Sequence, residues 1–354
     1  MINISQVYNY LIEEFLQISP EQIIVLSGLL DTSKSCELSD IKIIEELAIM
    51  IRVKGAYPVL DLATKTIKLR SLEETPEEKY YVPDEYFSQW VKLVDIIIDL
   101  SFPEIRNIFT DNYIASNKTD LINKSLQSIY KNMLISEKKV LLPNFPKPSI
   151  AEYYNIDLTD LERFYLSSFE PIESKMNVKG LKILNHIMPG ETYSLKSSDN
   201  EESILKLSIS DHQSYFVSNK ITNSYTVLPF GYVALTVNKN TLNGVFKADK
   251  LYYKNICRES VILTFSYGNI LSIQFENNDA LSEIIKVGIM NSKDRVEFFI
   301  GVNNGVSEPC NFNYYDRCLD NNFSLVFYDE VNNTIEISSS SVRLTNENSK
   351  DILL

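Results

Sequence analysis

The side chains best suited to acid–base and metal chemistry are scarce in this chain. Of its 354 residues, two are histidines, His186 and His212. His186 is flanked by apolar residues, so a structural role is favoured over that of a general base. His212 lies between polar residues, and a solvated turn is its expected setting. Enzymes that need several imidazoles are therefore excluded.

Nucleophilic chemistry has equally little support. The four cysteines form no Cys-x-x-Cys pair, so the sequence predicts neither a zinc ribbon nor a redox dithiol. Free thiols in a reducing compartment are expected instead. No Gly-x-Ser-x-Gly elbow is present, and no glycine-rich phosphate loop follows any expected strand. The cysteines are Cys36, Cys257, Cys310 and Cys318.

Carboxylates supply the remaining candidates. Asp316, Asp320 and Asp329 lie close together in the sequence, and an all-carboxylate site could hold a hard cation. Glu297 stands in the apolar run 296–300, where a buried carboxylate without a partner is costly. Glu297 therefore either points out of its sheet or has a defined role in a cleft, and the sequence leaves both open.

The elements that must position these residues differ between the two halves of the chain. The first half alternates helical and strand patterns, which indicates a parallel sheet with crossover helices. After about residue 180, short runs of β-branched and aromatic residues separated by Asn and Gly turns predict a largely antiparallel sheet. The expected helices are 7–15, Asp40 to the residue before Gly55, 149–152, one starting at Asp157, and 279–287; the expected strands are 22–30, 57–60, 94–100, 203–209, 233–237, 261–265 and 270–275.

The sequence therefore predicts an α/β N-terminal domain, residues 1–178, followed by a β-rich (α+β) C-terminal domain, residues 179–354. Asp and Glu outnumber Lys and Arg by 47 to 34, a net charge of −13. A chain this acidic repels phosphate backbones and anionic lipids, so neither nucleic acid nor a membrane is an expected partner. No apolar run of about 18 residues and no secretory signal are visible, and a cytoplasmic location is expected.

Four stretches carry a family resemblance. They are Asn-Phe-Pro-Lys-Pro-Ser-Ile-Ala (144–151), Asn-Ile-Asp-Leu-Thr-Asp-Leu-Glu-Arg-Phe (155–164), Leu-Pro-Phe-Gly-Tyr-Val-Ala (228–234) and Arg-Val-Glu-Phe-Phe-Ile-Gly-Val-Asn-Asn-Gly (295–305). In this order they resemble segments of the thermophilic metalloaminopeptidase family, of the aminopeptidase T and S type. The resemblance implies that family's two-domain fold over most of the chain.

The family's two-metal site, with two Glu, two His, an Asp and a Tyr, is poorly matched here. The resemblance places its first Glu at Tyr232, its second Glu at Glu297 and its first His at Ser324, and the final His-x-Asp has no counterpart. Catalytic zinc normally has three protein ligands, so one match among six implies no bound metal and no cofactor. Related ring-cleaving dioxygenases, which need a His-rich iron site, are disfavoured for the same reason.

We therefore expect a non-catalytic aminopeptidase-like protein that binds a peptide or protein segment, as an accessory factor in peptide processing or modification. The expected peptide-binding residues are Tyr232, Glu297, Asn303 and Ser324, and none is expected to be catalytic. Two alternatives stay open: an active metal-dependent aminopeptidase with altered ligands, and a structural dimer-forming protein without a ligand. The resemblance also implies a homodimer formed through the C-terminal domain, which the aromatic pairs in that half would suit.

Overall fold

The computed structural model of the chain divides into two compact units, described separately below. The first unit consists of residues 1–169 and 219–229, and the second of residues 170–218 and 230–354. The predicted domain boundary between residues 178 and 179 stays a prediction. The structure describes residues 3–30, 40–76, 79, 84–104, 128–129, 131–133, 135–170, 173–197, 202–210, 215–217, 225–275, 281–292, 294–306, 308–329, 334–340 and 342–346.

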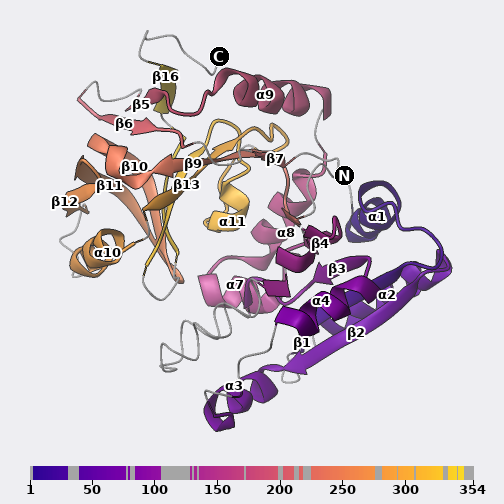
Figure 1. The fold of residues 1–354 in the computed structure, drawn as a ribbon. Helices are drawn as coiled ribbons and strands as arrows, with labels where there is room; N and C mark the ends of the chain where they lie inside the picture. The colour runs from indigo at the N-terminus through magenta and orange to yellow at the C-terminus, as the bar shows by residue number, and fades with distance from the viewer. Residues whose placement is uncertain are drawn as a thin grey trace. The chain divides into compact units, whose positions relative to one another are not determined.

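A parallel sheet forms the centre of the first unit, as the sequence predicts (Figure 1). Its strand order is β2-β1-β3-β4-β8, and each neighbouring pair is parallel. The strands are β1 (Ile23–Leu30), β2 (Tyr57–Thr64), β3 (Ile96–Asp99), β4 (Lys139–Leu142) and β8 (Tyr225–Val227). The last of these was not expected in this sheet, because it lies far along the chain within the strand-rich half.

Helix α2 (Asp40–Val53) connects β1 to β2 and contacts both strands. Its buried residues recur at helical spacing, at Ile43, Ile44, Leu47 and Ile51, so one face packs on the sheet. The chain leaves the helix at Gly55, which has a φ of 78° that glycine adopts readily. The unit also contains α3 (Lys65–Glu74) and α4 (Asp84–Leu93), which lie between β2 and β3 in the chain, and α7 (Pro148–Tyr154) and α8 (Leu158–Ser167), which follow β4.

The apolar stripe predicted over residues 7–15 is buried, but it is not one regular α-helix. Helix α1 (Ile4–Asn9) passes into a π-helical segment, η1 (Tyr10–Phe15), and the N–H of Leu16 donates to the carbonyl of Leu11 at 2.8 Å. The wider turn still buries Leu11, Ile12 and Phe15. The sequence pattern thus identifies the buried residues correctly, but it does not reveal that part of the segment is π-helical.

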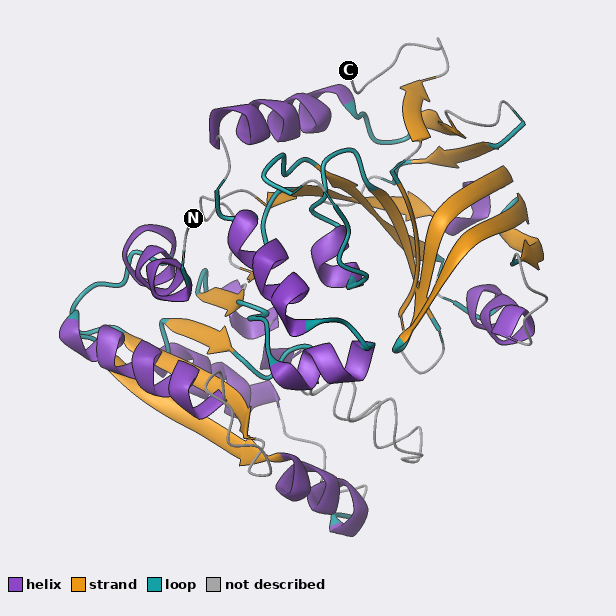
Figure 2. Cartoon of the chain, turned by 180° about the vertical axis from the view of Figure 1, so that it is seen from behind, coloured by secondary structure: helices purple, strands orange, loops and turns teal. Residues whose placement is uncertain are grey.

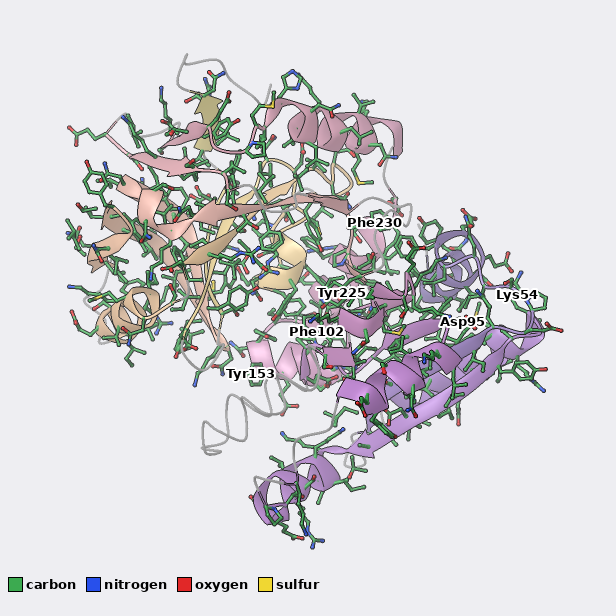
Figure 3. All side chains as sticks on the ribbon, viewed as in Figure 1. Lys54, Asp95, Phe102, Tyr153, Tyr225 and Phe230 are labelled. Carbon is green, nitrogen blue, oxygen red and sulfur yellow. The ribbon has the colours of Figure 1, made fainter. Side chains whose placement is uncertain are left out.

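Two ion pairs connect segments of the first unit that are distant in the sequence. Asp95, just before β3, accepts the N–H of Ile23 at 2.9 Å and pairs with Lys138 at 2.9 Å. Lys54, at the end of α2, pairs with Glu13 at 2.9 Å. Figure 3 labels Asp95 and Lys54 among the side chains of this unit. The Lys54–Glu13 pair is exposed and contributes little to stability on its own, whereas the Lys138–Asp95 pair is partly buried.

A curled antiparallel sheet forms the second unit, again as predicted (Figure 2). Its strand order is β16-β5-β6-β10-β15-β14-β13-β9-β7, and β11 pairs with both β10 and β12. The strands are β5 (Thr192–Ser197), β6 (Ile204–Ser208), β7 (Tyr215–Val217), β9 (Tyr232–Asn238), β10 (Asn243–Tyr253), β11 (Ile256–Ser266), β12 (Asn269–Gln274), β13 (Arg295–Gly301), β14 (Phe323–Tyr328), β15 (Thr334–Ser339) and β16 (Val342–Asn346).

The two faces of strands β13, β14 and β15 are covered by different segments. Helix α10 (Leu281–Met290), predicted over 279–287, contacts β14 and β15 on an apolar face that includes Ile335. The opposite face carries polar residues and meets the short helix α11 (Asn313–Asp316). The unit also contains α9 (Glu173–His186) and the 3-10 turn η3 (Lys239–Thr241). No helix in the described part of the chain is long and apolar enough to span a bilayer.

Candidate functional site

Three of the four predicted site residues share one face of the antiparallel sheet. Tyr232 lies opposite Gly301, and Ser324 lies opposite Phe299, while Glu297 is two residues from Phe299 on the same strand. Directly opposed residues and alternate residues along a strand point to the same side of a sheet. We call this side of β9, β13, β14 and β15 the polar face, and it also carries Glu336, opposite Val326.

Tyr232 and Glu297 lie on this face without lying opposite each other. Glu297 pairs with Thr236, four positions from Tyr232, which is about 13 Å along the strand. Tyr232 is buried, and its ring meets that of Phe299 edge-on with 5.5 Å between centroids. Glu297 is half-buried, and its Oε2 accepts the hydroxyl of Tyr328 at 2.6 Å. A direct Tyr232–Glu297 pocket is therefore not formed.

Asn303 is fully buried in the turn after β13 and is engaged with the backbone. Its Nδ2 donates to the carbonyl of Phe230 at 3.0 Å, and its Oδ1 accepts the N–H of Gly305 at 3.0 Å. Gly231, with a φ of 102°, makes this approach possible, because a Cβ there would lie 2.6 Å from the Cβ of Asn303. Asn303 thus joins the start of β9 to the end of β13.

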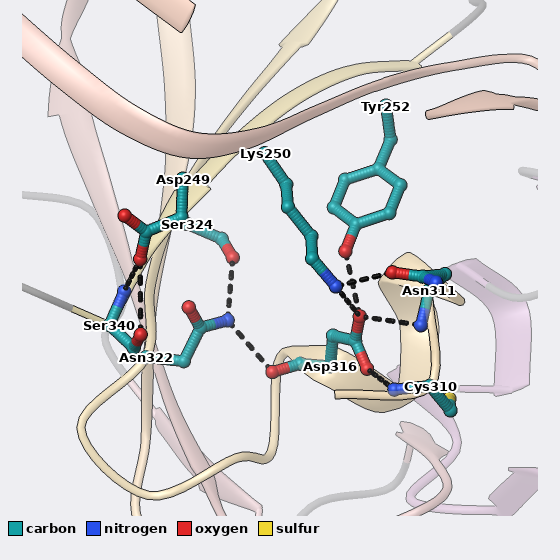
Figure 4. A network of polar contacts seen from close by, with 9 residues as sticks. All are labelled: Asp249, Lys250, Tyr252, Cys310, Asn311, Asp316, Asn322, Ser324 and Ser340. Atoms are coloured by element: carbon teal, nitrogen blue, oxygen red, sulfur yellow. Dashed lines mark hydrogen bonds and ion pairs between the residues drawn. The ribbon is translucent and has the colours of Figure 1, made fainter. Parts of the chain in front are cut away.

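Ser324 is buried at the edge of a network that centres on α11 (Figure 4). The Nδ2 of Asn322 lies 3.5 Å from its Oγ and donates to the carbonyl of Asp316 at 2.8 Å. Ser324 and the α11 segment are therefore linked through one amide side chain.

A buried ion pair occupies the middle of the polar face. The Nη2 of Arg317 lies 2.6 Å from Oε2 of Glu336, and its Nε lies 3.0 Å from both carboxylate oxygens. Asn313 donates to the same Oε2 at 2.8 Å. The guanidinium carbon sits 4.5 Å from the ring centroid of Phe299 and 4.9 Å from that of Tyr314. Burial acts to lower the pKa of Arg317, but the charge and hydrogen bonds of Glu336 outweigh burial and raise it.

A second pair of charges lies beside the first, on α11 and β10. Oδ2 of Asp316 accepts the hydroxyl of Tyr252 at 2.7 Å and lies 3.8 Å from Nζ of Lys250, which also contacts Asn311 (Figure 4). Oδ1 accepts the N–H of Cys310 at 2.8 Å. Burial raises the pKa of Asp316 in spite of these partners, and it raises the pKa of Tyr252.

Sequence reasoning missed most of this cluster. Arg317, Glu336 and Lys250 carry no local motif, and the elements that bring them together are α11, β15 and β10. The sequence groups Asp316 with Asp320 and Asp329 as a candidate carboxylate site, whereas in the structure Asp316 pairs with Lys250 and accepts the hydroxyl of Tyr252. Asp320 pairs with Lys179 at 2.6 Å. The described residues contain no group of three or more His, Cys, Asp or Glu side chains arranged to hold a metal ion.

The donors on the polar face do not fit a two-metal centre. Tyr232 offers a phenol packed on Phe299, and Ser324 offers a hydroxyl, where the resemblance implies Glu and His. Glu336 is already bound by Arg317 and Asn313. His186 lies exposed at the end of α9, where its Nδ1 is 2.7 Å from the carbonyl of Lys182. His212 and Cys36 lie outside the described residues.

Comparison with known proteins shows a distant likeness in structure. The sequence matches no family model and no curated protein. AmpT from Thermus thermophilus superimposes with a TM-score of 0.61 at 10% identity, over 98% of this chain and 96% of that one. The protein has an aminopeptidase-like fold. The 2,5-dihydroxypyridine dioxygenase from Pseudomonas putida KT2440 matches equally, with a TM-score of 0.61 at 10% identity, over 100% of this chain and 97% of that one. At this identity the likeness concerns the fold alone.

Proposed function

We propose that this aminopeptidase-like protein binds a peptide or protein segment at the polar face without hydrolysing it. The observation that carries the proposal is the contrast between Glu297 and the other two carboxylates on this side of the sheet. Glu336 and Asp316 are buried beside internal cations, Arg317 and Lys250. Glu297 is half-buried, accepts a hydrogen bond from Tyr328, and has no ion pair with any described residue.

A half-buried carboxylate of this kind suits the free amino terminus of a peptide. The α-ammonium is a cation with three donors, and Glu297 keeps acceptor capacity beyond the bond from Tyr328. A charge-assisted hydrogen bond in a partly desolvated place contributes about 1.5–3 kcal/mol. The replacement of a Glu and a His by Tyr232 and Ser324, implied by the resemblance, supports binding in place of hydrolysis.

The binding test uses a panel of tripeptide amides with free amino termini, each paired with its N-acetylated form. We expect free-amine members to bind in calorimetry and their acetylated forms to bind at least tenfold more weakly. Glu297→Gln should weaken binding by roughly tenfold to a hundredfold, at about 1.4 kcal/mol per decade. Glu283→Gln, the same change at an exposed position of α10, is the matched control. Equal affinity of Glu297→Gln and wild type would remove Glu297 from the site.

The absence of hydrolysis is tested separately. We expect no turnover of aminoacyl-4-nitroanilides, with or without added zinc, cobalt or manganese. Tyr232→Glu alone should not create activity, because a single added carboxylate does not complete three protein ligands. About two transition-metal ions per chain in elemental analysis, together with turnover, would instead favour the active aminopeptidase.

A further inference from the structure

The positions that the resemblance assigns to metal ligands surround one aromatic ring. Tyr232 meets the ring of Phe299 edge-on, Ser324 lies directly opposite Phe299, and Glu297 is two residues away on the same face. The guanidinium of Arg317 lies over this same ring, 4.5 Å from its centroid. The guanidinium of Arg317 therefore lies among the positions where the resemblance implies metal ligands.

We infer that Arg317, assisted by Lys250, is a resident cation that takes the electrostatic place of a metal ion on the polar face. Each cation lies beside a buried carboxylate, Arg317 beside Glu336 and Lys250 beside Asp316, with side chains 1% and 3% exposed for the two carboxylates. A buried carboxylate without a cation or a proton is strongly unfavourable. The two carboxylates are thus compensated by the chain itself, and the face needs no bound ion.

The backbone holds Arg317 in this place. Gly301 leaves room for the segment 317–319 against β13, because a Cβ at residue 301 would lie 2.0 Å from the carbonyl oxygen of Leu319 and 2.7 Å from that of Arg317. The N–H of Asn303 donates to the carbonyl of Cys318 at 2.9 Å, and the N–H of Gly301 donates to that of Asn322 at 2.8 Å. The guanidinium also makes cation–π contacts with the rings of Phe299 and Tyr314, at 4.5 Å and 4.9 Å from their centroids.

The geometry also distinguishes this pair from an ordinary surface contact. The carboxylate of Glu336 receives hydrogen bonds from Nε and Nη2 of Arg317 and from Asn313. A planar guanidinium can donate two parallel hydrogen bonds to one carboxylate, whereas the ammonium group of Lys acts as a point charge and cannot replace it in this geometry. Removing one member of a buried pair leaves an uncompensated charge, whereas removing both is far less damaging. The stabilities of the single and double variants can therefore be compared without measuring peptide binding.

The experiment compares wild type, Arg317→Ala and the double variant Arg317→Ala/Glu336→Gln by thermal unfolding, with and without EDTA or excess Zn²⁺ or Mn²⁺. Wild type should keep its Tm in EDTA and gain nothing from either metal. Arg317→Ala should lose roughly 6–20 °C, because it leaves the carboxylate of Glu336 buried without a cation. The double variant should lose less than Arg317→Ala, because it removes the buried charge together with its partner. Lys179→Ala, which breaks the more exposed pair with Asp320, is the control and should change Tm by at most a few degrees.

Three results would overturn the inference. They are stoichiometric metal in dialysed wild type with a lower Tm in EDTA, an Arg317→Ala variant as stable as Lys179→Ala, and a double variant that loses as much as Arg317→Ala. If Arg317→Ala does not fold, Arg317→Met/Glu336→Met replaces the double variant at closer volume. Folding of that variant near the wild-type Tm supports the inference, and failure of both to fold overturns it. Failure of the peptide panel on wild type would leave these measurements unaffected.

Discussion

Asp316 gives the polar face a pH dependence that can be assigned to one residue. Burial raises the pKa of its carboxyl above the ordinary 3.8, and the nearby Lys250 opposes this without cancelling it. The native state therefore binds a proton more tightly than the unfolded state does. Between the unfolded and the raised native pKa, the free energy of unfolding contributed by Asp316 falls as the pH rises.

Asp316→Asn removes this titration, so the stability of wild type relative to the variant should fall as pH rises from about 4 through the native pKa of Asp316. Urea unfolding of both proteins at several pH values between about 4 and 7 measures the difference. Asp320→Asn, which removes a carboxylate paired with Lys179, serves as the control. A relative stability that stays constant or grows with pH would contradict the assignment.

At the scale of elements, the turn that carries Arg317 depends on a residue without a side chain in the neighbouring strand. Gly301→Ala would place a Cβ 2.0 Å from the carbonyl oxygen of Leu319, which is backbone and cannot move alone. We expect a loss of about 1–3 kcal/mol or more in the free energy of unfolding, measured in urea. In Gly288→Ala the new Cβ meets the end of a flexible side chain, Cδ1 of Ile335, at 2.7 Å, and α10 gains helix propensity. A smaller loss for Gly301→Ala than for Gly288→Ala would show that the 317–319 segment can shift freely.

The elements themselves could be predicted where the signal is local. Helix α2 follows from residues that bury one face at regular spacing. Strand β1 follows from a short continuous apolar run that is buried on both faces, and β9 follows from a short β-branched run. Glu336 shows why the site could not be predicted in the same way. In the alternation Ile335-Glu336-Ile337 it has the pattern of an outward, solvated residue. Glu336 is nevertheless 1% exposed, because α11 and the following Arg317 cover that side of β15. Arg317 lies nineteen residues before Glu336 in the sequence.

Two of the segments that carry the resemblance each contain a glycine at a point of close backbone approach. Gly231 and Gly301 stand in the matched segments, and both permit close approaches that a side chain would block. The need for glycine at these two positions comes from the packing of the backbone and does not depend on which side chains line the polar face. The partners of Glu297 and Glu336 depend on Tyr328 and Arg317, whose segments carry no motif. Pairing across segments of this kind needs the three-dimensional arrangement.

At the scale of the whole molecule, the two structural neighbours have the same fold and different names, an aminopeptidase and a dioxygenase. One fold hosts unrelated chemistry, so function must be argued from the residues on the polar face. There the chain offers two internally compensated carboxylates, Asp316 and Glu336, and one half-buried carboxylate, Glu297. That charge distribution is the basis of our proposal that the polar face recognises a cationic group.

We propose that the protein forms a homodimer through the second unit. Helix α10 buries Leu281, Ile285 and Ile289 on one side, and β12 lies against it. Apolar residues of α10 and the adjacent hairpin are nevertheless more than half exposed; they are Tyr267, Leu271, Ile284, Val287 and Met290. A second copy would remove this surface from water.

Light scattering at micromolar concentration should therefore give about 81 kDa, twice the chain mass of 40.7 kDa. Ile284→Lys/Val287→Lys should shift the mass to that of one chain, because two desolvated ammonium groups are costly in an apolar interface. The matched control is Ile49→Lys/Val53→Lys, since these residues of α2 are even more exposed than Ile284 and Val287 but lie in the first unit. A wild-type mass near 41 kDa would count against the dimer. Dissociation by the α2 variant and not by the α10 variant would move the interface to the first unit, because the charges would then disrupt the surface that the second copy covers.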